Sequence, residues 1–319
     1  MSPRTEEIVL LRESVRDSLK SLHGGPVNEQ WPQSWTYSWD TFAEQGLWST
    51  IVPPEGSLAL AAVVVEELGR ALYSGPACET LVAAFVQDRL LDSAITDADI
   101  ASAPAFVSDD SLMVHPAPQT LLIVATSQGD LAIVSAAETE SSAVASLDVT
   151  RRLVRVRLRD QPLTIVSSPN SGLAAECRAV TALLYCADTL GCVEHVLHRT
   201  AEYASQRQTF GSPLGKYQAV AHRLVDHAVS MQQMRLLLDV AIAAFDGSAP
   251  DLLHHVATAE TFFYRCGSEI LSDCIQLSGA IGFTWEFGHH FYLRRAVQNT
   301  ALAGGRQRPQ QRLAQVAQW

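Results

Sequence analysis

Hydrophobic residues recur at three- and four-residue steps through most of the chain, a pattern typical of amphipathic helices. In the first hundred residues this spacing predicts helices at 5–22, 41–48, 58–72 and 78–91. From Ala174 onward the apolar stripe becomes broader, as the helices of a bundle require. There the spacing predicts four longer helices, at 174–205, 219–246, 251–277 and 286–302. Both ends of the chain are therefore predicted to be helical.

A different pattern occupies the middle of the chain, where short β-rich runs alternate with turn-forming residues. The predicted strands are 121–125, 131–134, 153–158 and 163–166. In the third of these runs, Val154 and Val156 fall on one face of the strand and Arg155 and Arg157 on the other. We therefore predict a mostly α fold with a small central β-domain. The predicted divisions are a helical domain at 1–101, a truncated β-domain at 102–170 and a four-helix bundle at 171–319.

Composition narrows the function classes. The chain of 319 residues is 47% hydrophobic and 18% charged, as in ordinary soluble proteins with an ample core. Its net charge of −11 argues against a nucleic-acid partner, because phosphate binding favours a basic face. The first residues lack the layout of a signal peptide, and apolar stretches such as 179–187 are too short to span a bilayer. We expect a cytoplasmic protein with no membrane partner.

The cysteines and histidines do not form a metal-binding pattern. None of the six cysteines belongs to a C-x-x-C pair, so we expect buried, reduced thiols without zinc or disulfides. The paired histidines at 254–255 and 289–290 are predicted to lie on helices. Neighbouring side chains on a helix point about 100° apart, so neither pair suits one metal ion. No metal site is predicted.

The segment 207–218, Arg-Gln-Thr-Phe-Gly-Ser-Pro-Leu-Gly-Lys-Tyr-Gln, is the strongest candidate for a binding site. It connects two long predicted helices. We expect Arg207 to be buried there and to offer a fork of donors suited to phosphate. Thr209 adds a hydroxyl, and Gln218 can hydrogen-bond a base or a ribose. A solvated or helix-capping role for Arg207 is the alternative, and the residues alone leave it open.

This connector resembles the R-x-x-F-G-x-P-L-x-x-x-Q signature of the acyl-CoA dehydrogenase family. Residues 276–295 are similar to the family's Q-x-x-G-G-x-G segment, with Ala280 in place of the second glycine. Residues 47–71 resemble the end of the family's amino-terminal helical domain. The resemblance spans most of the chain and implies FAD as cofactor. The residues that it assigns to the ADP half of FAD are Arg207, Thr209, Phe210, Gln218, Gln276, Leu277, Gly279 and Ala280.

The same resemblance reveals what the chain lacks. Family members remove an α-proton with a carboxylate, and the positions that match this base carry Ala303 and Thr181. Neither side chain accepts a proton in that role, so no catalytic residue is predicted. The family motifs that line the flavin ring and the thioester are not recognisable in the β-domain. A base relocated to Glu176 or Asp188 is the alternative, although both lie out of phase on the helix.

The retained and missing residues together resemble the short, non-catalytic subunit of a heteromeric acyl-CoA dehydrogenase of the actinobacterial steroid side-chain type. Such a subunit donates the ADP half-site to a longer acyl-CoA dehydrogenase subunit in an α2β2 heterotetramer. The resemblance implies that the partner holds most of a bulky acyl-CoA, and that an electron-acceptor flavoprotein completes the cycle. Two alternatives stay open: an autonomous homo-oligomeric dehydrogenase, and a flavin-free scaffold or regulatory subunit.

Overall fold

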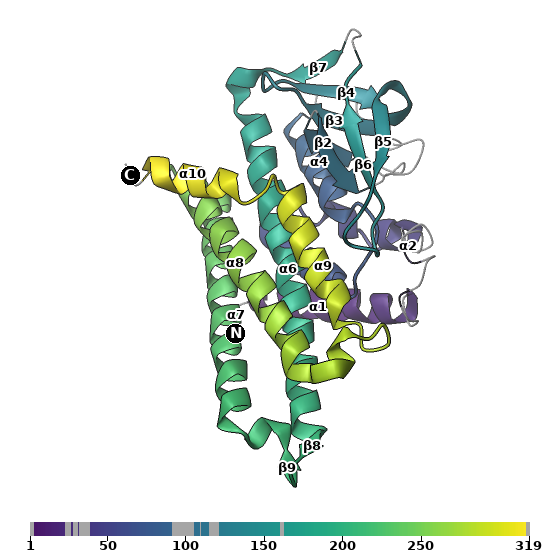
Figure 1. Ribbon diagram of the computed structural model, residues 1–319. Coiled ribbons are helices and arrows are strands. Elements are labelled where there is room, and N and C mark those ends of the chain that lie inside the picture. Colours follow the sequence, from purple (N-terminus) through teal and green to yellow (C-terminus); the bar gives the residue numbers. More distant parts are fainter. Residues whose placement is uncertain are drawn as a thin grey trace.

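The computed structural model describes residues 3–22, 27, 31, 39–90, 105–108, 110–114, 121–159 and 163–316. The predicted domain boundary at residue 102 and the predicted helix end at residue 91 lie outside these ranges. The described chain is mostly helical, with a small β part beside one end of a long bundle (Figure 1). The predicted fold class is confirmed.

Helices form where the apolar spacing predicts them, with ends shifted by a few residues. The amino-terminal helices are α1 (Pro3–Leu22), α2 (Trp39–Glu44), α3 (Leu58–Arg70) and α4 (Ala77–Arg89). The carboxyl-terminal helices are α6 (Leu173–Gln206), α7 (Gln218–Asp246), α8 (Leu252–Ser278), α9 (His289–Leu302) and α10 (Gln307–Val316). The sequence prediction missed α10, because its glutamine- and arginine-rich segment carries few apolar residues. It packs on α8 at the upper end of the bundle in Figure 1.

The β part contains two sheets and three strands that the sequence did not predict. One sheet has the order β1 (Ala105–Ser108), β3 (Leu121–Ala125), β4 (Leu131–Ser135), β7 (Thr164–Ser167). The other has the order β2 (Ser111–Val114), β6 (Leu153–Arg157), β5 (Glu140–Val144). The missed strands are β1, β2 and β5. Two of them are only four residues long, and β5 is mainly exposed, so neither apolar periodicity nor length marked them.

The central strand β3 explains how the two sheets and the helices share a core. Leu122 and Val124 face the second sheet, where they pack with Val154 and Val156 of β6. Ile123 belongs to the large core that the helices form. Because β3 is covered on both faces, its sequence is a continuous apolar run rather than an alternating one. The predicted alternation of β6 is confirmed, since Val154 and Val156 are buried and Arg157 is exposed.

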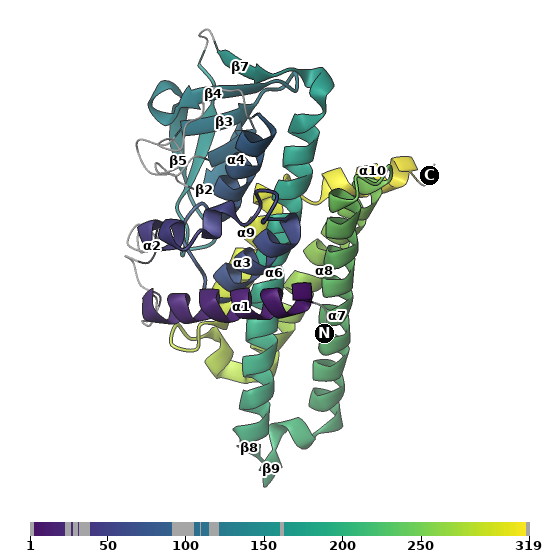
Figure 2. The ribbon, with the colours of Figure 1, turned by 180° about the vertical axis from the view of Figure 1, so that it is seen from behind.

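Two glycines allow α3 and α6 to cross at very short range. A Cβ atom added to Gly191 would lie 1.9 Å from the carbonyl oxygen of Glu66, and one added to Gly69 would lie 2.2 Å from that of Asp188. Any side chain at either position would force the two helices apart. Seen from behind, α1 lies across α3 (Figure 2). The amino-terminal helices are therefore fixed to the middle of the bundle.

A buried polar network joins the loop before β6 to α6 and α9. The fully buried Arg295 of α9 forms an ion pair with Asp148 and donates to the carbonyl oxygen of Tyr73 at 2.9 Å. Arg151, also buried, forms an ion pair with Asp188 of α6 at 2.8 Å. Each of these charges has an opposite partner, as buried ions require. The network anchors the β part to the bundle.

Helices α6 and α7 differ sharply in how much of their apolar surface is covered. Both are long and apolar enough to cross a membrane, so the expectation that no such stretch exists is wrong by length and composition. The most apolar part of α6 is 83% buried as the central helix of the fold, whereas that of α7 is only 28% buried. Val225, Val229, Leu236 and Val240 are exposed along α7 at spacings of four, seven and four residues. These four side chains, which we call the α7 stripe, lie along one helix face, with the exposed Gln232 and Gln233 between Val229 and Leu236.

Candidate functional site

The connector 207–218 forms a short hairpin at the lower end of the bundle (Figure 1). Strands β8 (Gln208–Thr209) and β9 (Ser212–Pro213) pair, and the turn between them places Phe210 at a φ of 48° with its side chain fully exposed. The amide of Arg207 donates to Tyr203 at 2.8 Å, and its carbonyl accepts from Leu214 at 2.7 Å. The backbone of Arg207 is thus fixed on both sides.

The side chain of Arg207 does not follow the prediction, because it is exposed rather than buried. Within the described ranges, its guanidinium takes part in no hydrogen bond or ion pair. The hydroxyl of Thr209, by contrast, is buried and has no hydrogen-bond partner among the described residues. Tyr217 donates to the carbonyl oxygen of Thr209 at 2.7 Å, which holds the hairpin against the start of α7. The connector therefore holds an exposed cation and a buried hydroxyl, neither of which has a partner among the described residues.

The second predicted segment ends α8. Gln276 and Ala280 are exposed, whereas Leu277 is buried against the bundle. Gly279 caps α8 at a φ of 67°, a conformation that favours glycine. A Cβ atom added to Gly279 would meet nothing within 4 Å, so its backbone angle rather than a close approach explains the glycine in this chain.

Contacts between helices bring the two segments to the same end of the bundle. Arg223, near the start of α7, forms an ion pair with Asp273, one turn before the end of α8. The part of the second segment that precedes α9 reaches α6, where the ring of Phe287 lies 5.6 Å from that of Tyr203. We call the exposed residues Arg207, Gln218, Gln276 and Ala280, together with the Thr209 hydroxyl, the connector face. Its polar groups suit an anionic ligand that approaches from outside the chain.

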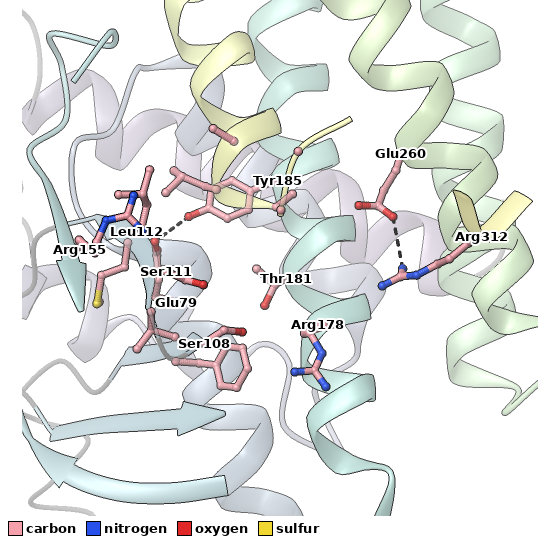
Figure 3. A pocket seen from close by; sticks show the side chains of 18 residues that line it. Glu79, Ser108, Ser111, Leu112, Arg155, Arg178, Thr181, Tyr185, Glu260 and Arg312 are labelled. Carbon is pink, nitrogen blue, oxygen red and sulfur yellow. Dashed lines mark hydrogen bonds and ion pairs between the residues drawn. The ribbon is translucent and has the colours of Figure 1, made fainter. Parts of the chain in front are cut away.

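A pocket of about 370 Å³ lies at the other end of the bundle, between α4, α6, α8, the β part and the segment after α9. We call it the upper pocket; Figure 3 shows it from close by. Both positions at which the family resemblance places a catalytic base, Thr181 and Ala303, line this pocket. The Thr181 hydroxyl donates to the carbonyl oxygen of Cys177 at 2.8 Å. Neither position supplies a carboxylate there.

Two buried carboxyl groups line the upper pocket that the sequence analysis did not single out. Glu79 of α4 accepts a hydrogen bond from the Tyr185 hydroxyl at 2.6 Å (Figure 3). It accepts another from the amide of Val114 at 3.1 Å. Burial raises the pKa of Glu79 above its ordinary value. Glu260 of α8 accepts from the Tyr264 hydroxyl at 2.7 Å. The signal in the sequence was a single glutamate inside the apolar run of α4.

The alternative bases fit the upper pocket poorly. Asp188 accepts from Arg151 and from the Asn299 amide, both at 2.8 Å, so its oxygens are occupied. Although burial alone would raise the pKa of Asp188, the charges of Arg151 and Arg295 hold it below its ordinary value. Glu176 is not among the residues that line the pocket. Neither carboxylate is placed to take a proton from a molecule bound there.

The structure shows where the six cysteines and the paired histidines lie. All six thiols are buried and free. Among the described residues, no group of three or more His, Cys, Asp and Glu side chains is arranged to hold a metal ion. His289 is buried next to Thr200, whereas His290 lies beside the Trp285 ring. The two rings point to different surroundings, as expected for neighbours on a helix.

Comparison with known proteins places this geometry in a family. The family model for the acyl-CoA dehydrogenase C-terminal domain matches residues 172–317. The acyl-CoA dehydrogenase IpdE2 of Mycobacterium tuberculosis is 33% identical, and the alignment covers 93% of each chain. Among solved structures, a variant of the steroid ACAD Tcur3481–Tcur3483 superposes with a TM-score of 0.83 at 22% identity, covering 98% of both chains. The ChsE4–ChsE5 complex from Mycobacterium tuberculosis superposes with a TM-score of 0.80 at 18% identity, covering 100% of this chain and 98% of that one. The chain belongs to the acyl-CoA dehydrogenase family.

Proposed function

We propose that this chain is the short, non-catalytic subunit of a heteromeric acyl-CoA dehydrogenase. The observation that carries the proposal is the upper pocket, where Thr181 and Ala303 stand at both positions expected for the base. An enzyme of this class needs a carboxylate within reach of the acyl α-carbon. A longer acyl-CoA dehydrogenase subunit supplies that carboxylate, and the present chain contributes to the partner's site from its connector face.

The residues of the connector face suit the anionic half of FAD. Arg207 is exposed and unpaired among the described residues, and the buried Thr209 hydroxyl lacks a partner. A guanidinium fork and a hydroxyl are suitable donors for pyrophosphate oxygens, and the Gln218 and Gln276 amides suit a ribose or base. FAD supplies hydride acceptance when bound. In this proposal the residues of the present chain bind and orient it without moving a proton.

The outer surface of α7 supports a multi-subunit assembly. The α7 stripe leaves four large aliphatic side chains exposed on one helix face. Exposed apolar side chains that gather on one face are typical of interaction surfaces. A heterotetramer of two copies of each subunit, with one FAD per pair, covers this face. The relatives named as ChsE4–ChsE5 and Tcur3481–Tcur3483 carry two subunit names each, which favours a pair of different chains.

The substrate of the assembly is proposed from the relatives. One solved relative is titled a steroid ACAD, so we propose a bulky, steroid-derived acyl-CoA that lies mainly in the partner subunit. The reaction removes hydrogen from the α and β carbons of the acyl group. An electron-acceptor flavoprotein then reoxidises the cofactor. We place the assembly in the cytoplasm.

Co-expression with a longer acyl-CoA dehydrogenase from the native host tests the proposal. Expressed alone, the chain should aggregate, because the α7 stripe is uncovered. It should show no turnover, because Thr181 and Ala303 supply no carboxylate. The co-purified complex should contain one FAD per pair of chains and oxidise acyl-CoA. A monodisperse, yellow protein that bleaches with an acyl-CoA in the absence of a partner would establish the autonomous enzyme instead. A complex whose FAD content is indifferent to changes on the connector face would establish the scaffold.

A further inference from the structure

Glu79 is an unusual group in the upper pocket, because it is a fully buried carboxyl without an ion pair among the described residues. Its two hydrogen bonds, from the Tyr185 hydroxyl and the Val114 amide, both end on Oε1. Within the part of the chain that the structure describes, no hydrogen bond uses the other oxygen, Oε2. The nearby Arg151 is engaged with Asp188. One oxygen of Glu79 is thus left for a further partner.

The protonation state of Glu79 decides what that partner must be. Burial in a site without a paired cation raises the pKa of Glu79 and favours the neutral carboxyl. Because Oε1 already accepts two hydrogen bonds, the proton belongs on Oε2. A neutral carboxyl donates one hydrogen bond through that proton. The matching group on a ligand is an acceptor, such as a carbonyl or hydroxyl oxygen.

The walls of the pocket favour a ligand without charge. Phe106, Leu112, Met113 and Leu302 provide apolar surface, and Thr181 carries only a hydroxyl that is bonded to its own helix. Three arginines line the pocket. Arg155 pairs with Asp110 at 3.4 Å, Arg312 lies 3.7 Å from Glu260, and Arg178 is engaged in an interaction of its own. A volume of about 370 Å³ falls in the range of small-molecule sites.

We propose that the upper pocket of this chain binds an uncharged, mainly apolar small molecule through a carbonyl or hydroxyl oxygen that accepts a hydrogen bond from Glu79. Tyr185 is a positioning residue, because its hydroxyl fixes the orientation of the carboxyl. The molecule is held and not converted. This binding is independent of the proposed donation of the connector face, so either proposal can fail without the other.

Calorimetric titration of the purified complex tests the site with two probes of equal chain length, 2-undecanone and undecanoate. The ketone offers an uncharged acceptor, whereas undecanoate brings a negative charge. We expect the ketone to bind at least about tenfold more tightly, because the carboxylate of undecanoate loses its hydration in the pocket while the described arginines there are already engaged. Thr181→Trp fills the pocket of this chain alone and should abolish that binding, which separates it from any binding in the partner subunit.

Two substitutions at Glu79 separate the hydrogen bond from the shape of the pocket. Glu79→Gln retains a donor and should bind the ketone within about threefold of the unmodified complex. Glu79→Leu removes the donor and should weaken binding about fivefold to tenfold, as the loss of one hydrogen bond predicts. Melting temperatures of all variants establish that they are folded. The proposal is overturned if the ketone does not bind, or if neither Glu79→Leu nor Thr181→Trp changes its affinity.

Discussion

Charged and polar groups differ between the two ends of the helical bundle in whether they have partners within the chain. Around the upper end and the middle, charges such as Arg295, Arg151 and Asp188 are buried and paired within the chain. At the lower end, Arg207 is exposed and unpaired among the described residues, and the Thr209 hydroxyl is buried without a partner. Polar groups that are satisfied internally serve the fold, whereas unpaired ones on a fixed backbone suit a ligand. The comparison assigns the buried ion pairs to the fold and the exposed Arg207 to ligand binding; Glu79 of the upper pocket, whose two hydrogen bonds both end on Oε1, belongs with the second kind.

The largest expected effect is a loss of stability when the buried Arg295–Asp148 ion pair is broken. Arg295→Ala leaves Asp148 as a buried charge without its guanidinium, and we expect the complex to lose about 3–5 kcal/mol of unfolding free energy. Urea denaturation of the complex, followed by circular dichroism, measures the loss. Arg294→Ala is the matched control, since Arg294 is only partly buried, and it should change stability little. Equal effects of both substitutions would contradict the structural role given to Arg295.

Substitutions on the connector face should lower the affinity for FAD and leave the unfolding free energy unchanged. Arg207→Ala removes the guanidinium from the proposed pyrophosphate contact, at a cost of about 2–5 kcal/mol, so FAD affinity should fall tens- to thousands-fold. The FAD content of the dialysed complex measures this, and added FAD should restore most of the turnover. Lys216→Ala provides a control, because Lys216 is an exposed cation in the same connector. Full retention of FAD by the Arg207→Ala complex would show that the connector face is wrongly assigned.

A neutral hydrogen-bonding residue on the connector face, Gln276, should contribute less to FAD affinity than Arg207. Gln276→Ala removes a hydrogen bond that is worth about 1 kcal/mol net, so FAD affinity should fall roughly fivefold. Arg207→Ala should lower FAD affinity more than Gln276→Ala does, because a charged donor binds a pyrophosphate oxygen more strongly than a neutral one. Fluorescence titration of the apo-complex with FAD gives both affinities. A larger loss for Gln276→Ala than for Arg207→Ala would reverse the assignment of the main contact.

Restoring a carboxylate to the upper pocket should have the smallest effect on activity. Ala303→Glu places a carboxyl where the family resemblance expects the base, yet the β part lacks the recognisable motifs that line the flavin ring. We expect one FAD per pair of chains and unchanged turnover, measured by absorbance and by steady-state kinetics with acyl-CoA. A second FAD per pair, or a doubled turnover, would mean that this end of the chain is a complete site that lacks only its base.

Local patterns in the sequence predicted much of the fold and part of the site. The apolar stripes of the bundle helices and the alternation in β6 reflect faces that are buried, and these can be read residue by residue. The connector could be found because its residues are contiguous. Strands β1 and β2 were missed because they are short and pair with segments that do not follow them directly; Met113 of β2, for example, lies opposite Val154. Strand β5 was missed because it is mainly exposed.

The sequence by itself determined the helical periods, the central β part, the connector motif and the lack of a carboxylate at Thr181 and Ala303. Only the tertiary structure decided that Arg207 is exposed, and that both empty base positions face one pocket. It also brought Glu79 within 2.6 Å of Tyr185, a residue more than one hundred positions away. The physical reason is that periodicity records which face of an element is buried. Burial against a particular partner, and the pKa that follows from it, exists only once distant elements pack together.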